Sequence, residues 1–363
     1  MKQNKKEFNE ALGVPSNITQ TAQELFNDFK REFKKRINVN ELEYEFQYKP
    51  RFPYRIADMD INEIIFHVNL QPTDQTNQVE VLSMGVPSSA SVETSGKKPI
   101  ILTVDKQGTS QLFINLAVPE DWSEGEVIHY FDSNRVKNIS TFAHELKHEY
   151  DSFKKPAGSV KERAKYVGAK EMIGGLPPLR DFAFNLYYIS DIESLVRPSE
   201  VAAELRTSKI PKKDFLEFII NNDTYKQLKE IHEFSVDEMK EELKKYADDI
   251  REIAIELEVD NAENLTDDEL ASFALHIGYV TLIDKTSEKY FEYLFPNPLT
   301  ILFDPETDKK KDWFETYRKR ALRFKDNPEN FYKNAEKDFK IKGLKMMRKL
   351  VKLYDYIIEN PSE

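Results

Sequence analysis

The chain has 363 residues and a net charge of −11 at pH 7, with 40% hydrophobic and 32% charged residues. This acidic balance argues against a general nucleic-acid binder, because attraction to phosphate groups needs clustered positive charge. The absence of cysteine excludes disulfides, thiolate zinc sites, iron–sulfur clusters and a cysteine nucleophile. The N-terminal stretch lacks the apolar region of a signal peptide, and no apolar run approaches the ~20 residues of a membrane span. We therefore expect a cytoplasmic protein without a membrane partner.

The first predicted element is an amphipathic helix over residues 18–37, where apolar side chains recur every three or four positions. Thr21 and Glu24 have the spacing of a capping box, which would start the helix at Thr21 and leave Ile18 just outside it. The two patterns leave the start of this helix open by about one turn.

Five segments rich in alternating or continuous apolar residues are predicted to be strands: 42–49, 61–70, 78–84, 99–105 and 111–119. The polar stretch 88–98 among them is predicted to be a flexible loop. The last two strands flank Gly108 and are predicted to form a hairpin.

From Asp132 onward the apolar pattern becomes helical. Helices are predicted over residues 133–155, 181–190 and 191–209, with Pro198 as a kink or a restart in the last of them. Almost everything beyond Ile210 is predicted to be helical.

This order of elements predicts an α+β fold. We expect an N-terminal helix with a mainly antiparallel sheet in residues 1–130, two functional helices in residues 131–210, and a helical region in residues 211–363.

The stretch TFAHELKHEYDSF places His144 and His148 four residues apart, with Glu145 directly after the first histidine. On a helix, residues four apart lie on one face, so the two imidazoles can converge on one tetrahedral ion. Glu145 lies about 100° further around the helix and can reach water at the open coordination position. This HExxH spacing therefore favours zinc-dependent hydrolysis, with two ligands and a general base. The alternative is a solvated surface helix with ordinary histidines.

With these residues the chain resembles the zincin metallopeptidases, whose twisted sheet packs on the HExxH helix. The sequence HELKHEYDSF lacks the third histidine of the metzincins, so the resemblance implies a glutamate ligand further on, as in gluzincins. The pattern YY-x4-E-x2-VRP-x-E is similar to that of HExxH peptidases encoded by large tailed phages, where the glutamate after the paired tyrosines is the ligand. That position is Glu193 here, and the resemblance covers residues 130 to 205.

The sequence leaves two glutamates open as the third ligand. Ser190 and Glu193 also have capping-box spacing, which would explain Glu193 without a metal. Glu200 and Glu204 form an E-x-x-x-E pair, similar to the E-x-x-x-D of thermolysin-like enzymes, in which the second acid orients a ligand histidine. We favour Glu193 as the ligand and expect Glu200 to lie beside Arg197 or a ligand histidine.

Four further side chains are candidates for supporting roles. Asp151 lies along the face of the two histidines and can accept the free ring N–H of one of them; the alternative is a solvated acid at the end of the helix. Arg197 and Tyr188, with its neighbour Tyr187, can stabilise the oxyanion of a tetrahedral intermediate, although core packing is favoured for the tyrosines. The four other histidines are interpreted as structural: His67 in a strand, His129 in a loop, and His232 and His276 on helices.

Together these features predict a zincin-like metallopeptidase that binds Zn²⁺ through His144, His148 and Glu193 and uses Glu145 as general base. A strand at 111–118 is expected at the edge of the sheet, where an extended peptide substrate can add as a further strand. The helical region after residue 210 is expected to close the cleft or bind a protein partner.

Two other functions remain as alternatives. One is a catalytically silent zincin-fold structural protein such as a virion component. The other is a zinc hydrolase that acts on a non-peptide amide. The phage resemblance would place the protein in a host-cell cytoplasm or in a virion.

Overall fold

The computed structural model describes residues 14–15, 17–74, 79–85, 91–93, 100–102, 108–154, 176–189, 191–285 and 327–359. These residues form a helix-rich mixture of eleven α-helices and small sheets, which confirms the predicted mixture of α and β structure. Among them, no helix combines the length and the apolar character that crossing a membrane requires. The chain divides into two compact units: residues 1–160, 195–224 and 349–363 in the first, and residues 161–194 and 225–348 in the second.

A four-stranded sheet lies at the centre of the first unit, in the order β1–β4–β8–β5. Its strands are β1 (Glu43–Tyr48), β4 (Glu63–Thr73), β8 (Thr109–Pro119) and β5 (Glu80–Gly85). β4 and β8 run parallel, and the other two pairings are antiparallel. Alternate residues of β1, such as Tyr44 and Phe46, are buried, as the sequence pattern predicts. This alternation fixes the register, because a shift by one residue would expose the buried set.

The predicted hairpin around Gly108 is wrong. The short strand β7 (Ile100–Leu102) pairs with β6 (Ser91–Glu93), so part of the predicted loop is also a strand. Gly108 has a φ of 78°, and its carbonyl oxygen accepts hydrogen bonds from the backbone N–H groups of Asn62 and Glu63. A Cβ atom at Gly108 would lie 2.5 Å from Nδ2 of Asn62. Glycine therefore lets β8 start directly beside the start of β4, which sets the two strands parallel.

The expectation that residues 111–118 form an edge strand of the sheet is also wrong. β8 has β4 on one side and β5 on the other, so its backbone groups already have partners. A strand in this position cannot accept a peptide by strand addition. The outer strands of the described four-stranded sheet are β1 and β5.

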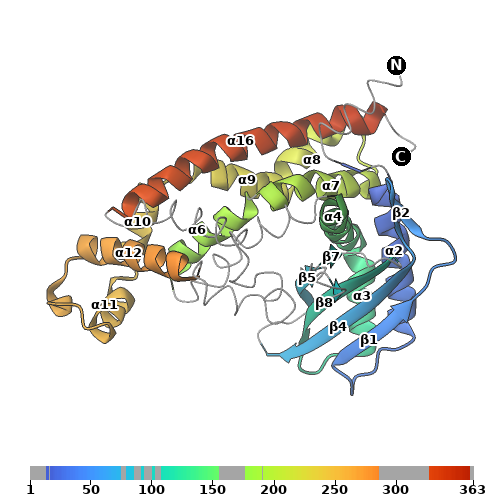
Figure 1. Cartoon of the computed structure of the whole chain (residues 1–363), viewed down its shortest axis with the longest axis horizontal. Helices are drawn as coiled ribbons and strands as arrows, with labels where there is room; N and C mark the ends of the chain where they lie inside the picture. The colour runs from blue at the N-terminus through green and yellow to red at the C-terminus, as the bar shows by residue number, and fades with distance from the viewer. Residues whose placement is uncertain are drawn as a thin grey trace. The chain divides into compact units, whose positions relative to one another are not determined.

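Three helices cover one face of this sheet, as Figure 1 shows: α2 (Ile18–Lys34), α3 (Glu124–Ser133) and α4 (Arg135–Lys154). Phe29 of α2 lies at the centre of the core between them. Its ring centroid is 5.2 Å from that of Phe66 on β4, 5.3 Å from that of Phe131 on α3 and 5.8 Å from that of Phe142 on α4. These aromatic contacts hold α4 in place behind the sheet.

Helix α2 begins at Ile18, so the capping-box interpretation of Thr21 is wrong. Asn17 precedes the helix in a left-handed conformation, and the hydroxyl of Thr21 donates to the backbone carbonyl of Arg55 at 2.7 Å. Arg55 belongs to a short hairpin, β2 (Tyr54–Ile56) with β3 (Met59–Ile61), that the sequence pattern did not reveal. Thr21 therefore ties this hairpin to the helix rather than capping it.

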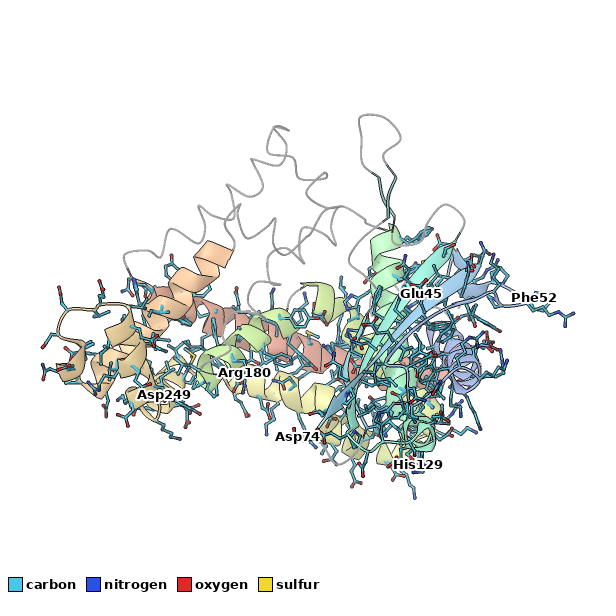
Figure 2. All side chains as sticks on the ribbon, turned by 90° about the horizontal axis from the view of Figure 1, so that it is seen from below. Glu45, Phe52, Asp74, His129, Arg180 and Asp249 are labelled. Carbon is cyan, nitrogen blue, oxygen red and sulfur yellow. The ribbon has the colours of Figure 1, made fainter. Side chains whose placement is uncertain are left out.

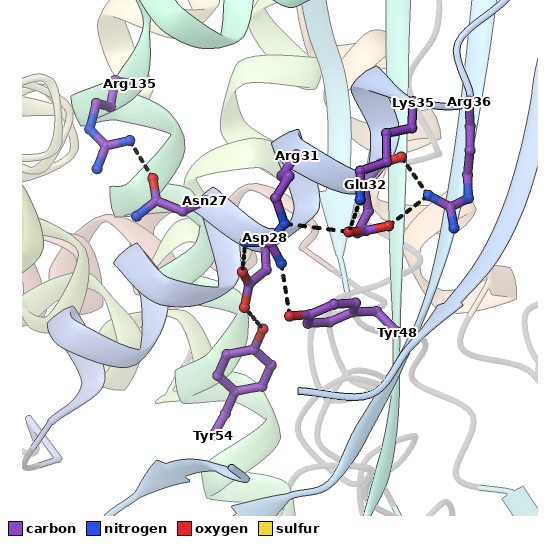
Figure 3. A network of polar contacts seen from close by, with 9 residues as sticks. All are labelled: Asn27, Asp28, Arg31, Glu32, Lys35, Arg36, Tyr48, Tyr54 and Arg135. Carbon is purple, nitrogen blue, oxygen red and sulfur yellow. Dashed lines mark hydrogen bonds and ion pairs between the residues drawn. The ribbon is translucent and has the colours of Figure 1, made fainter. Parts of the chain in front are cut away.

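A polar network on α2 makes two further contacts, one with β2 and one with β1 (Figure 3). Asp28 accepts a hydrogen bond from the hydroxyl of Tyr54 at 2.5 Å and pairs with Arg31 at 2.6 Å. Arg31 in turn donates to the hydroxyl of Tyr48 on β1 at 2.9 Å. Burial and the hydrogen bond to Asp28 raise the pKa of Tyr54, so its hydroxyl stays a donor.

Two expectations near the functional helices need correction. His129 lies on α3, which starts with a capping box formed by Ser123 and Glu126, and not in a loop. The predicted helix at 191–209 is confirmed as α7 (Asp191–Ser208); of the two expectations for Pro198, a kink or a restart, the restart is wrong, because Pro198 lies inside the helix. The first unit then continues through a 3-10 turn (Lys212–Asp214) and α8 (Phe215–Asn221).

The second unit is built from helices, as the sequence predicts for the described part of the chain beyond residue 210. Its helices are α6 (Pro177–Tyr188), α9 (Asp223–Glu233), α10 (Val236–Lys244), α11 (Ala247–Glu256), α12 (Asp267–Lys285) and most of α16 (Glu329–Glu359). Phe182 of α6 lies in its core, with its ring 4.7 Å from that of Tyr332 and 5.7 Å from those of Phe234 and Phe339.

We predict that Phe29→Ala lowers the free energy of unfolding by about 3–5 kcal/mol, because it leaves a cavity among four elements. The matched control is Phe52→Ala, since the side chain of Phe52 is 72% exposed and points away from the sheet in Figure 2. Urea denaturation of both variants checks this. Equal losses in the two variants would contradict the assignment of Phe29 to the centre of the core.

Candidate metal centre

The middle of helix α4 is buried, which removes the HExxH residues from water. His144 and Glu145 are each 8% exposed and His148 is 5% exposed. Neighbouring polar side chains such as Asn138 and Lys147 are buried too. Ionisable groups are rarely buried without a partner, because desolvation of a charge is costly. The alternative of a solvated surface helix is therefore wrong.

His144, His148 and Glu193 lie together. One potential ligand atom from each of them falls within 4.8 Å of the others, and all three residues are buried. The Nε2 atoms of the two histidines are 3.0 Å apart, and their rings meet edge to face. The i, i+4 spacing on α4 brings the imidazoles together, and the first turn of α7 supplies the carboxylate.

This donor set fits a zinc ion. Two nitrogens bound to tetrahedral zinc at ~2.0–2.1 Å would lie about 3.3 Å apart, close to the distance between the two Nε2 atoms. Two imidazoles and one glutamate are also a donor set that catalytic zinc sites use, with the fourth position left for water or substrate.

Glu200 orients one of the histidines. Its Oε2 atom lies 3.2 Å from Nδ1 of His144 and 2.8 Å from Nη1 of Arg197. Burial alone would raise the pKa of Glu200, but the charge of Arg197 and the contact with His144 lower it to about 2. Glu200 is therefore an ionised acceptor, so Nδ1 of His144 carries the proton and Nε2 presents its lone pair to the cluster.

The two glutamates that the sequence left open thus have different positions on α7. Glu193 is in the cluster, while Glu200 lies beside both Arg197 and His144. Arg197 forms an ion pair with Glu200. The sequence left an oxyanion role open for Arg197, and the structure shows this carboxylate as a partner of its guanidinium.

Glu204 forms the next layer of polar contacts. Its carboxylate accepts hydrogen bonds from the hydroxyl of Ser140 on α4 at 3.1 Å and from the amide of Asn222 at 2.6 Å. Burial raises the pKa of Glu204 to about 7, and the negative charge of Glu200 adds to this shift. Through these two hydrogen bonds Glu204 joins α7 to α4 and to the end of α8, one helical turn from Glu200.

Glu149 is a second buried carboxyl beside the general-base candidate. It follows Glu145 by one helical turn, is 1% exposed, and accepts a hydrogen bond from the hydroxyl of Ser110 on β8 at 2.5 Å. Burial raises the pKa of Glu149 to about 8; the bond from Ser110 opposes the shift and the charge of Glu145 increases it. The structure therefore places two carboxyl groups close enough to influence each other on this side of α4.

The sequence pattern did not reveal the contact between Glu149 and Ser110. Glu149 had a local signal, since it follows Glu145 by four residues in HELKHE. Ser110 had none, because it reaches α4 only through the packing of β8 against that helix.

Two remaining candidates, Asp151 and Tyr188, have contacts outside the group of His144, His148 and Glu193. Asp151 pairs with Lys147 on its own helix, so the carboxylate bonded to His144 is that of Glu200. Tyr188 is buried on α6 with its ring 5.6 Å from that of Phe184, in line with the favoured packing role.

Three of the four other histidines have protein partners outside the cluster. His67 stacks on Phe113 at 4.2 Å in the sheet, and His232 bonds the carbonyl of Lys340 at 2.8 Å. His129 lies 3.1 Å from the hydroxyl of Ser133 on α3, and His276 is exposed on α12.

The chain matches no protein-family model, no curated protein and no solved structure. The chemistry of these residues must therefore be inferred from their own geometry.

We predict that Glu204 lowers the free energy of unfolding in a pH-dependent way. Its folded pKa of about 7 lies above the ordinary value of 4.5, so the folded state holds the proton more tightly than the unfolded state. The loss in the free energy of unfolding is absent below pH 4.5, grows between pH 4.5 and about 7, and levels off above that at about 3 kcal/mol. Glu204→Gln removes this part of the pH dependence.

Urea denaturation between pH 4.5 and 8 measures the effect, with the exposed Glu217→Gln on α8 as the control. The wild type and the control should lose stability over this range relative to Glu204→Gln. Parallel curves for all three proteins would show that Glu204 is not buried as described.

Proposed function

We propose that the protein is a zinc-dependent metallopeptidase of zincin-like fold, in which His144, His148 and Glu193 hold the ion. The observation that carries this proposal is the convergence of two imidazoles and one carboxylate in a buried cluster, with the glutamate of HExxH on the same helix. The order of elements also supports it: a sheet packed on the HExxH helix, then a later helix that carries the third carboxylate.

A zinc ion bound by these residues would supply Lewis-acid polarisation and lower the pKa of water towards ~7. Glu145 then has the role of general base: it takes a proton from the attacking water and returns it to the leaving amine.

Glu200 and Arg197 prepare His144 for its role. The bond between Nδ1 of His144 and Glu200 fixes the tautomer and the ring orientation, and Arg197 keeps Glu200 ionised. The link from Glu204 to Ser140 on α4 holds α7 against the helix that carries both histidines. The role of these residues in the proposal is to position the ligands.

A second candidate, a catalytically silent zinc protein, is favoured by one observation. Every residue of the cluster and Glu145 itself are at most 8% exposed, as is common in structural zinc sites. Glu145 separates the two functions, because zinc binding alone does not need a base at that position.

We predict that Glu145→Gln lowers peptide hydrolysis by ~10²–10⁴-fold, the usual contribution of a general base, and leaves one zinc per chain. Cleavage of a fluorogenic peptide library and elemental analysis measure the two quantities, with the exposed Glu230→Gln as the control. His148→Ala should lose the zinc. Full activity in Glu145→Gln would contradict the mechanism, and zinc without any hydrolysis in the wild type would favour the silent protein.

We predict that the two glutamates of α7 respond differently to truncation. Glu193→Ala removes a ligand and should abolish stoichiometric zinc binding. Glu200→Ala should weaken the zinc affinity by ~10–100-fold, since it removes only the partner of a ligand histidine. Competition with a chromogenic chelator measures both affinities. Tighter zinc binding by Glu193→Ala than by Glu200→Ala would reverse the assignment of the third ligand.

A further inference from the structure

Helix α16 carries an exposed basic face in the second unit. Lys337, Ile341, Lys345 and Arg348 follow one another at spacings of four, four and three, which places them on one side of the helix. All four are exposed, and Ile341 is 67% exposed. Among the described residues, Lys337, Lys345 and Arg348 have no acidic partner within ion-pair distance. We call these four residues the basic face.

Helix α11 of the same unit carries an exposed acidic face. Asp248, Glu252, Ile255 and Glu256 share one side of this helix, again at spacings of three and four. Ile255 is 47% exposed, and the three acids are exposed. We call these four residues the acidic face. Asp249 extends it, and Figure 2 shows this labelled side chain on the outside of the helix.

The acidic face is not neutralised within its own helix. Arg251 is the basic residue of α11, and it donates instead to the backbone carbonyls of Ala262, Glu263 and Leu265 at 2.9–3.3 Å. On the opposite side of α11, Ile250 and Ala254 are buried in the unit. The helix therefore packs through its apolar side and leaves the acidic face to water.

The basic face and the acidic face have opposite charges and a similar composition. Each combines three charges of one sign with one exposed isoleucine at helical spacing, and all eight residues are exposed. Complementary charge around a small apolar contact is the usual composition of a specific but moderate interface. The net charge of −11 also disfavours nucleic acid as the partner of the basic face.

We propose that the basic face of α16 binds the acidic face of α11 in a second copy of this chain. The contact uses different surfaces of the two copies, so a two-fold pair can make it twice. Because both faces lie at the surface, the association depends on salt and weakens when screening is strong.

Sedimentation velocity of the full chain tests this association. We expect the wild type to move from one chain of 42.5 kDa towards two in about 50 mM salt and to return to one chain in about 500 mM salt. The triple variant Lys337→Glu, Lys345→Glu, Arg348→Glu should stay a single chain in low salt. A wild type that is a single chain in low salt would overturn the proposal.

The matched control reverses two other exposed lysines and one exposed arginine: Lys213→Glu, Lys226→Glu and Arg180→Glu. It makes the same change in net charge and leaves the basic face intact, so it should associate like the wild type. Loss of association in the control as well would show that net charge, and not the basic face, governs the result.

A mixing experiment identifies the partner surface. The variant Asp248→Lys, Glu252→Lys, Glu256→Lys should also be a single chain, because both of its faces are then basic. An equimolar mixture with the α16 triple variant restores opposite charges between copies, so it should associate in low salt. A mixture that stays dissociated would overturn the pairing of these two faces, and retardation of a single-stranded oligonucleotide by the wild type alone would assign the basic face to nucleic acid.

Discussion

The candidate metal centre depends on one constraint: ionisable side chains that leave water must find partners. His144, Glu145, His148 and Glu149 on α4 and Glu193 on α7 are all buried, and the two helices could not hold them there as isolated charges. The hydroxyl of Ser110 donates a hydrogen bond to Glu149. Arg197 and His144 lie within hydrogen-bond distance of the neighbouring carboxylate of Glu200. A cation among His144, His148 and Glu193 would complete the same compensation. Burial, polar partners and metal binding are thus parts of one arrangement.

The position of α4 follows from the aromatic core beneath it. Phe29 contacts rings on β4, α3 and α4, so the helix that carries both histidines rests on the same cluster that joins the sheet to α2. The parallel pairing of β4 with β8 then brings Ser110, at the start of β8, to the side of α4 that bears Glu149. Gly108 makes that start possible, since its backbone conformation and close approach to Asn62 leave no room for a side chain.

Local patterns predicted much of this correctly. The alternation around Tyr44 and Phe46 revealed β1, and helical spacing revealed α4 and the relation of His144 to His148, because each pattern is complete within a few residues. The pairing of residue 63 with residue 109 could not be predicted in this way, since antiparallel hairpin geometry and a parallel crossover leave similar local patterns. The bonds of Glu204 to Ser140 and Asn222 were hidden for the same reason, as they join three helices distant in sequence.

The spacing of three glutamates along helix α7 limits how its length can change. Glu193, Glu200 and Glu204 are separated by seven and four residues, so at about 100° per residue they share a stripe roughly 40° wide. A single inserted or deleted residue between Glu193 and Glu200 would turn one carboxylate about 100° away from the others. The stretch between these two glutamates should therefore tolerate substitution far better than any change in length, and homologues with this centre should keep the interval constant.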